Sequence, residues 1–384
     1  MNNRTNDPWE LEMSRTFDQR VRDLHEAPLS FDQIQHKAGR IRRNRRAAVA
    51  GGVLAAAAVI VPVAVVGGGD LFDSSSKPPV ADRDGENQRE HAEDTGTFAY
   101  VEGRTLHLAD GDTVRLGADY TWVAEASSGW FALRNDPDTG DLTLDLLDAG
   151  GEVTESADLA SSPVVSDDRS TIAYATTDDT LVVREDGALS ELGGALPENT
   201  FPVAVTDGKV YLQDGMGGPP QVVDLETGRT RTAVPDAIGL QDVTEGGLAA
   251  VMTESQDEGS CGGVHDLTTS DYLWQTCDYF LLGLSPDGRY VQATHPYLDG
   301  IGIAWTAILD ARTGQELFRL ESPGNGFYGT SAWQDDEHLL VTFFEYDSQE
   351  WSVHRISAAG TDDVVLGPKP GGDMDPVFRP LNAR

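Results

Sequence analysis

The fold is indicated most clearly by Phe280-Leu281-Leu282-Gly283-Leu284-Ser285-Pro286-Asp287-Gly288-Arg289-Tyr290-Val291-Gln292. Two apolar runs flank a tight turn at Asp287-Gly288, which is the pattern of two paired β-strands. Comparable turns recur along the chain at Glu102-Gly103, Ser128-Gly129, Asp167-Asp168, Asp207-Gly208, Glu245-Gly246, Asp287-Gly288 and Asp335-Asp336. The stretch therefore belongs to a repeat.

A second hairpin follows each of these turns. Its turns are Ala109-Asp110-Gly111, Asp148-Ala149-Gly150, Glu185-Asp186-Gly187, Glu226-Thr227-Gly228, Leu267-Thr268-Thr269, Arg312-Thr313-Gly314 and Ala358-Ala359-Gly360. The second hairpins recur at roughly 40 residues, the period expected of β-propeller blades. We therefore expect an all-β propeller of seven blades over residues 97–384.

The first repeat unit is one strand short. Phe98-Ala99-Tyr100-Val101 precedes its first turn in the position of a second strand, so the innermost strand is missing. Residues 375–379 lie beyond the seventh unit and can supply that strand. Closing the ring with both chain ends would remove an exposed sheet edge.

The repeats resemble those of divergent WD40-like and TolB-like propellers. The resemblance rests on Leu284-Ser285-Pro286-Asp287-Gly288-Arg289-Tyr290-Val291 and on the Asp-x-x-Thr-Gly sets that begin at Asp136, Asp224 and Asp310. It covers about residues 97–380 and implies the fold but no activity. The Gly-His and Trp-Asp signatures of WD40 proper are absent, so that family's partner-binding rules do not carry over.

Charge divides the chain. Residues 1–46 carry ten Lys/Arg and seven Asp/Glu, a net of +3, whereas the whole chain is at −36, which leaves −39 after residue 46. An acidic surface repels phosphate backbones and anionic lipid, so we expect no nucleic-acid binding. Solubility explains the acidic surface, and cation binding is the alternative.

Residues 47–69 contain no charged side chain and match the length of a transmembrane helix. A cleaved signal peptide fits poorly, because 46 residues precede the run and no clear Ala-x-Ala site follows. A lipoprotein is excluded, because the only cysteines are Cys261 and Cys277. Arg40-Ile41-Arg42-Arg43-Asn44-Arg45-Arg46 precedes the span, so the positive-inside rule keeps residues 1–46 in the cytoplasm and the propeller outside.

The segments around the span have distinct compositions. Residues 70–96 are rich in Ser, Pro and charges and predict a disordered linker. In the tail, Asp7, Pro8 and Glu10 predict a helix start, and a second helix follows Ser30. The first helix carries one apolar stripe, a candidate partner-binding surface, formed by Trp9, Met13, Phe17, Val21 and Leu24. The chain as a whole resembles single-pass membrane proteins of high-GC actinobacteria. The resemblance lies in the order of its parts: a tail, an Arg-rich boundary, an apolar span and an acidic outer domain.

The two cysteines fit an extracytoplasmic location. If the hairpin of residues 262–276 turns at Thr268-Thr269-Ser270, Cys261 and Cys277 lie opposite each other at its open end. Such a pair can form a disulfide, which persists only in an oxidising compartment. Two buried thiols or a metal pair are the alternatives, but the further Cys or His ligands that zinc needs are missing.

Strand direction alternates within a blade, so the connections between second and third strands and those between blades share one face of the ring. The long, irregular segments fall on this face: residues 134–141, 213–220, 253–262, 295–302, 322–329 and 345–350. Binding residues concentrate on such loops. The candidate ligand-binding residues are Tyr297, Asp299, Phe327, Tyr328, Glu345, Tyr346 and Trp351, whereas Trp274, Trp305, Trp333 and Phe343 are expected in the core.

No catalytic motif is found. The outer histidines show no close metal-ligand spacing, and neither Gly-x-Ser-x-Gly nor a phosphate-binding Gly-rich loop occurs. We therefore expect no metal, no cofactor and no catalysis. The leading hypothesis is a membrane-anchored extracytoplasmic binding or scaffold module for a protein or cell-envelope ligand. The alternatives are a transmembrane regulator resembling anti-sigma proteins, whose tail helix binds a cytoplasmic partner, and a propeller hydrolase.

Overall fold

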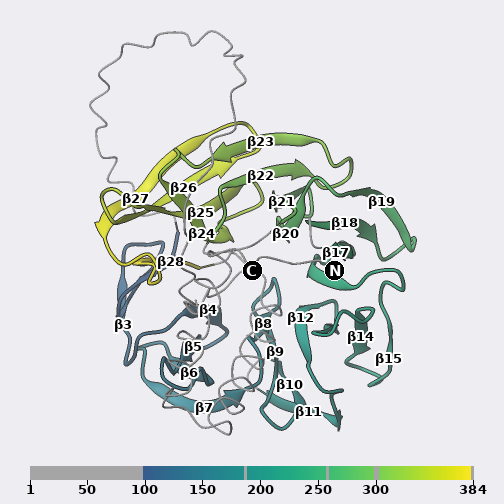
Figure 1. Ribbon diagram of the computed structural model, residues 1–384. Coiled ribbons are helices and arrows are strands. Elements are labelled where there is room, and N and C mark those ends of the chain that lie inside the picture. The colour runs from purple at the N-terminus through teal and green to yellow at the C-terminus, as the bar shows by residue number, and fades with distance from the viewer. Residues whose placement is uncertain (1–97, 186–187, 257–258, 298–301, 382–384) are drawn as a thin grey trace, which may run out of the picture. The chain divides into compact units, whose positions relative to one another are not determined.

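The computed structural model describes residues 98–185, 188–256, 259–297 and 302–381. They form seven antiparallel four-stranded sheets, arranged as blades around a common axis (Figure 1). The predicted seven-bladed all-β propeller is confirmed. The predicted tail helices, the apolar span at 47–69 and the linker at 70–96 lie outside the described residues. Within the described ranges, no helix has the length and apolar character needed to cross a membrane.

Each blade has four strands, ordered from the axis of the ring outward. The first three blades are β28 (Phe378–Pro380), β1 (Tyr100–Glu102), β2 (Thr105–His107), β3 (Thr113–Arg115); β4 (Trp122–Ala126), β5 (Gly129–Asn135), β6 (Leu142–Asp148), β7 (Val153–Leu159); and β8 (Val164–Val165), β9 (Thr171–Ala175), β10 (Thr180–Glu185), β11 (Ala188–Ala195). Blades 4 and 5 are β12 (Thr200–Thr206), β13 (Lys209–Asp214), β14 (Gln221–Asp224), β15 (Thr230–Thr232); and β16 (Gly239–Val243), β17 (Leu248–Gln256), β18 (Gly259–Asp266), β19 (Asp271–Thr276). Blades 6 and 7 are β20 (Phe280–Leu284), β21 (Tyr290–Thr294), β22 (Trp305–Asp310), β23 (Glu316–Glu321); and β24 (Gly326–Trp333), β25 (His338–Glu345), β26 (Glu350–Ser357), β27 (Asp362–Pro370).

The ring is closed by the C-terminal strand, as predicted. β28 pairs antiparallel with β1, with Val101 opposite Arg379. Phe378 is 4% exposed, and its ring packs edge-on against Tyr100 at a centroid distance of 6.1 Å. The strand begins three residues later than expected, because residues 371–377 form the connection from blade 7. Since β28 takes the innermost position, the turn at Glu102-Gly103 joins second and third strands and is not equivalent to the other six first turns.

The Asp-x-x-Thr-Gly sets form one type of turn. In the turn after β22, Asp310 Oδ1 accepts hydrogen bonds from the Thr313 amide and hydroxyl, both at 2.8 Å, and Gly314 closes the turn at a φ of +73°. The side chain thus replaces the hydrogen bonds that the turning backbone loses. Asp266 forms the same turn with Ser270, at a φ of +64°, where the other sets have glycine. The sequence pattern missed this copy.

The core lies between blades. For example, Leu248, Ala250 and Val264 of blade 5 pack with Leu281 and Val291 of blade 6, and all five are at most 3% exposed. Because each blade has a neighbour on both sides, side chains on both faces of its sheet are buried. The stacked blades form a rigid support for the connections at their ends.

Candidate functional site

The ring presents two different faces. We call the face with the connections between second and third strands and between blades the loop face, and the opposite one the short-turn face. The longest connection on the loop face joins β21 to β22 across residues 295–304. On the short-turn face, the turns of residues 225–229, 267–270 and 311–315 share one form, in which an Asp side chain caps the turn, and Asp136 caps the same turn on the loop face.

Exposed apolar side chains are divided between loops and outermost strands. Among the described residues, the large apolar side chains that are exposed on the loop face are Met216, Tyr297, Tyr346 and Met374, with exposed fractions of 67, 46, 44 and 38%. The others, Val153, Leu317 and Val364, lie singly on the outermost strands β7, β23 and β27. Isolated apolar residues are ordinary on a surface, but several in neighbouring loops are typical of an interaction site.

The predicted ligand-binding residues separate into two groups. Phe327, Tyr328 and Trp351 are buried, with exposed fractions of 6, 1 and 1%, so they do not belong to the exposed surface of the loop face. Burial also raises the pKa of the Tyr328 hydroxyl.

Trp333 and Phe343 are buried as expected, while Trp274 and Trp305 are partly buried against the core of blades 5 and 6. Tyr297, Glu345 and Tyr346 are exposed on the loop face. Asp299 lies outside the described residues.

The buried aromatic residues hold Tyr346 in place. Its ring lies 5.7 Å from that of Phe327 and 5.3 Å, edge-on, from that of Phe344. Trp351 packs against both phenylalanines, with centroid distances of 5.7 and 5.1 Å. Tyr346 therefore rests on a packed aromatic base while nearly half of its surface faces solvent. An aromatic ring held in this way loses little conformational entropy on binding.

Backbone hydrogen bonds join the loops of blades 6 and 7. Ile303 and Tyr328 exchange two bonds of 2.9 Å, which fix the end of the 295–304 connection to the start of β24. The chains approach so closely here that a Cβ on Gly302 would lie 2.0 Å from the Phe327 ring. The Tyr346 amide donates to the Asn325 carbonyl at 2.8 Å.

The loop of blade 7 is also fixed to the connection that leads to the closing strand. The Gly371 amide donates to the Gln349 carbonyl at 3.0 Å, and Trp351 Nε1 donates to the Gly372 carbonyl at 2.8 Å. Met374 lies in this same connection. The loops that carry Tyr346 and Met374 are therefore adjacent.

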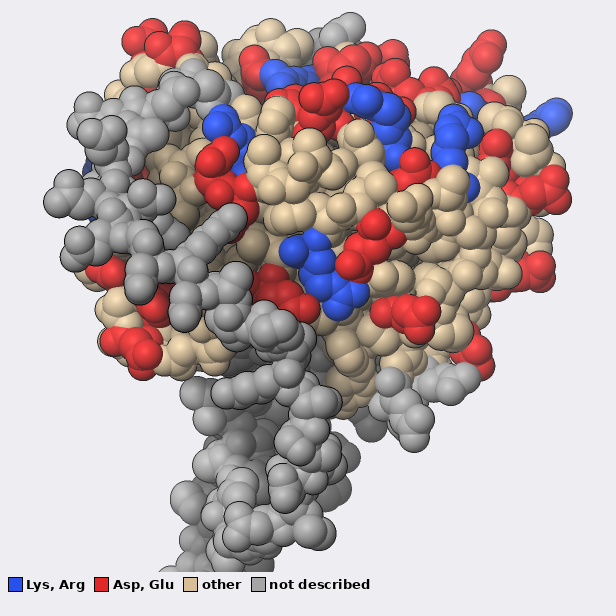
Figure 2. Space-filling model, turned by 90° about the horizontal axis from the view of Figure 1, so that it is seen from above, with Lys and Arg blue, Asp and Glu red and all other residues tan. Residues whose placement is uncertain are grey.

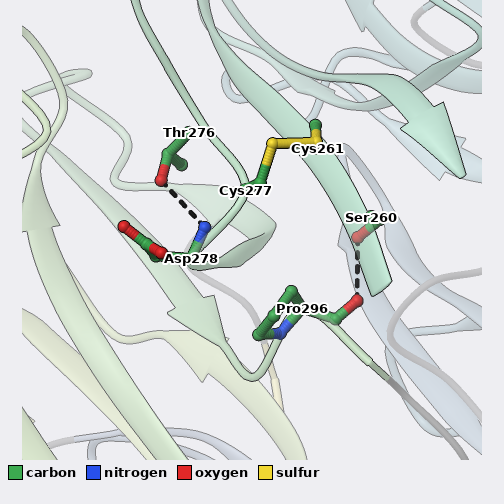
Figure 3. The surroundings of a disulfide bond; sticks show 6 residues. All are labelled: Ser260, Cys261, Thr276, Cys277, Asp278 and Pro296. Atoms are coloured by element: carbon green, nitrogen blue, oxygen red, sulfur yellow. Dashed lines mark hydrogen bonds between the residues drawn. A yellow bond between two sulfur atoms is a disulfide. The ribbon is translucent and has the colours of Figure 1, made fainter. Parts of the chain in front are cut away.

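The predicted disulfide joins Cys261 of β18 to Cys277, directly after β19, across the open end of the hairpin (Figure 3). The hairpin has the predicted register, with Gly262 opposite Thr276. Beside the bond, Ser260 donates to the Pro296 carbonyl through its amide at 3.0 Å and through its hydroxyl at 2.9 Å. The disulfide thus lies on the loop face, where blade 5 contacts the long loop of blade 6.

A cavity of about 200 Å³ lies along the innermost strands of blades 2 to 7. Several of its polar groups already have protein partners. Asp242 accepts hydrogen bonds from the amides of Leu284 at 2.7 Å and Val243 at 2.8 Å. The Ser331 hydroxyl donates to Gln292 at 2.7 Å. These bonds hold blades 5, 6 and 7 together, so we assign the cavity a structural role.

Titratable side chains do not gather into a recognisable catalytic or metal site in the described part of the chain. No group of three or more His, Cys, Asp or Glu side chains there could hold a metal ion. Two histidines pair with carboxylates, His338 with Asp335 at 3.0 Å and His354 with Asp362 at 2.7 Å. Neither ring has a Ser or Cys hydrogen-bond partner among the residues described. Figure 2 shows acidic side chains over one side of the molecule, with fewer basic ones among them.

Comparison with known proteins shows no family for this chain. No protein-family model matches the sequence, and no curated protein does. Among solved structures, the dihydro-heme d1 dehydrogenase NirN is similar with a TM-score of 0.46 and 16% identity over 75% of this chain and 65% of that one. BamB from Moraxella catarrhalis matches with a TM-score of 0.39 and 16% identity over 64% of this chain and 78% of its own. The Cps50 (Swd1) propeller domain of Myceliophteria thermophila matches with a TM-score of 0.44 and 13% identity over 65% of this chain and 87% of its own. The seven four-stranded sheets make this chain a seven-bladed β-propeller, and these similarities, all with low TM-scores, carry no conclusion about its function.

Proposed function

We propose that this chain is a membrane-anchored extracytoplasmic propeller that binds a protein or cell-envelope ligand through its loop face and performs no catalysis. One observation carries the binding role: exposed aromatic and methionine side chains lie in loops of this face that are fixed to one another. Tyr346 is the clearest case, because buried rings support it while 44% of its surface is exposed. Rigid, partly exposed aromatic residues are typical anchors of binding surfaces.

Two features support the location. The uncharged run at 47–69 follows an Arg-rich segment, which favours a cytoplasmic tail and an external propeller. The Cys261–Cys277 disulfide fits this topology, since such bonds persist in oxidising compartments.

Labelling of intact cells tests the location. After reduction, a thiol reagent that does not cross membranes should modify Cys261 and Cys277, the only cysteines. The matched control is the variant Cys261→Ser/Cys277→Ser, which should take up no label. Protection of both thiols in intact cells, with labelling after lysis, would overturn the external placement.

Affinity purification of the full chain from detergent-solubilised envelopes tests the binding role. We expect a co-purifying envelope component that is lost in Tyr297→Ser/Tyr346→Ser and kept in Leu317→Ser/Val364→Ser, whose exposed side chains lie on outermost strands. Equal recovery by both double variants would contradict recognition by the loop face.

A further inference from the structure

We infer that the loop face of blades 5 to 7 docks a basic segment of a partner protein, in which Lys or Arg side chains flank an apolar one. The inference rests on the proposed function and specifies the partner. We define the loop sector as residues 277–279, 295–297, 302–304, 322–325, 346–349 and 371–377, with the strand ends Glu345 and Glu350.

The apolar part of the loop sector consists of Tyr297, Tyr346 and Met374. Their exposed fractions are 46, 44 and 38%, and each lies in a different connection. The connections that carry Tyr346 and Met374 contact each other through the Gly371 and Gln349 backbones. This arrangement offers a partner more than one exposed apolar side chain, of which Tyr346 rests on packed aromatic rings.

The charged part of the loop sector has a single sign. Its carboxylates belong to Asp278, Glu345, Asp347, Glu350, Asp373 and Asp375, and its sequence contains no Lys or Arg. Two basic residues border the sector, but both are already paired: Lys369 with Glu102, and Arg379 with Asp375 at 2.9 Å. Among the described residues, no basic side chain lies within ion-pair distance of Glu345, Asp347 or Asp373.

The short-turn face shows that this is not a general property of the acidic surface. Arg169 pairs there with Glu125, and Arg289 pairs with Asp287 and Glu337. Arg229 and Arg312 lie in two further turns of that face. Basic side chains therefore pair with several carboxylates of the short-turn face, whereas in the loop sector Arg379 pairs with Asp375 and, among the described residues, none pairs with Glu345, Asp347 or Asp373.

Charge and apolar surface together select the partner. An uncompensated negative field attracts cationic segments, raises their association rate and repels polyanions such as nucleic acid or anionic lipid. Tyrosine rings add apolar contact and can accept a Lys or Arg over their faces. A metal ion would use the carboxylates but gain nothing from Tyr297 and Tyr346, so a basic peptide segment uses both parts of the sector.

Selection from a displayed library of random peptides tests the inference, with the detergent-solubilised full chain as the target. We expect selected peptides to be enriched in Lys or Arg next to an aromatic or aliphatic residue. Their binding should be lost in Tyr297→Ser/Tyr346→Ser and fall about three- to tenfold at low salt in Asp347→Asn/Asp373→Asn. The control Leu317→Ser/Val364→Ser should bind as the wild type does.

The remaining outcomes separate the two proposals. If the selected peptides are neutral or acidic and their binding is lost in Tyr297→Ser/Tyr346→Ser, the proposal of a basic partner would be overturned. Recognition by the loop face would then still stand. An unchanged affinity of basic peptides in Asp347→Asn/Asp373→Asn at low salt would also overturn the basic partner. No enrichment, or peptides unaffected by the tyrosine variant, would overturn both proposals.

Discussion

The two faces of the ring lie at opposite ends of the same strands, yet they are built differently. On the short-turn face, Asp224, Asp266 and Asp310 cap turns of one form with the same side-chain oxygen. On the loop face, connections differ in length, carry the disulfide and expose Tyr297 and Tyr346. Capped turns recur on the short-turn face, with one copy at Asp136 on the loop face, whereas the lengths of the loop-face connections vary more widely, so these connections can acquire a binding role.

The largest effect should come from the closing strand, on which both faces depend. Phe378→Ala removes a side chain that is 4% exposed and packs with Tyr100 in the cluster of blades 1 and 7. We expect the free energy of unfolding to fall by about 3–5 kcal/mol, as for other buried Phe→Ala changes. Urea unfolding of the full chain measures this, with the exposed Val364→Ala as control. If the free energy of unfolding falls by less than about 1 kcal/mol, the ring does not depend on the packing of the closing strand β28.

Loss of the disulfide should have the next largest effect. Cys261→Ser/Cys277→Ser opens a loop with a sequence separation of 16 residues. A cross-link of this span contributes about 2–3 kcal/mol, mainly by restricting the unfolded chain. Hydrogen exchange should show the loss of protection concentrated in β18 and β19. Uniform loss of protection over all blades would mean that the bond supports the whole ring and not the loop face of blade 5.

A turn on the short-turn face should matter for stability and not for binding. Asp310→Ala leaves the Thr313 amide and hydroxyl and the Arg312 amide without their acceptor. We expect a loss of about 1–2 kcal/mol in the free energy of unfolding. Peptides selected on the wild-type chain should bind this variant unchanged. Reduced peptide binding would show that the two faces are not independent.

The capped turns also predict the smallest effect, a dependence of stability on pH. A hydrogen bond from the Thr268 hydroxyl, with others from the Thr268 and Thr269 amides, lowers the pKa of Asp266 although partial burial opposes this. The pKa of Asp224 is lowered likewise, first by the Thr227 hydroxyl. Because the folded pKa lies below the unfolded value of about 3.9, these turns stabilise the fold above that pH. Their contribution is lost as the pH falls through the folded pKa.

Urea unfolding between pH 6 and pH 2 measures this dependence. Asp266→Asn keeps an acceptor oxygen but cannot titrate, so its stability should decline less steeply over the acid range than that of the wild type. A parallel decline in Asp266→Asn would assign the acid sensitivity to other carboxylates. The exposed loop-face variant Asp347→Asn is the matched control.

Much of the fold could be predicted from the sequence, because local turn chemistry marks the hairpins. The Asp-Gly repeats identified seven blades, and the spacing of Cys261 and Cys277 around one hairpin identified the disulfide. The hairpin turn at Leu267-Thr268-Thr269 was predicted, but it was not recognised as a copy of the Asp-x-x-Thr-Gly turn, because Ser270 takes the left-handed position that glycine occupies elsewhere. Thus the pattern failed where an unusual residue adopts the usual backbone conformation.

The candidate site could be predicted only in part. Phe327 and Tyr328 are neighbours in one strand, which ordinarily places one side chain outward. In a blade both sheet faces are covered, so Phe327 packs towards Phe344 and Trp351 while Tyr328 packs towards Phe343. A register shift between Tyr328 and Ser331 further disturbs the alternation. The central cavity was missed too, because it needs strands from six blades that are distant in sequence.

Photo-crosslinking in living cells tests the division of the ring into a binding face and a structural face most directly. A photoreactive amino acid is introduced singly at Tyr297 or Tyr346 on the loop face, and at Glu226 or Thr269 on the short-turn face. We predict that the two loop-face positions crosslink to the same partner protein and that neither short-turn position does. Crosslinks from Glu226 or Thr269 with none from Tyr297 and Tyr346 would contradict this division.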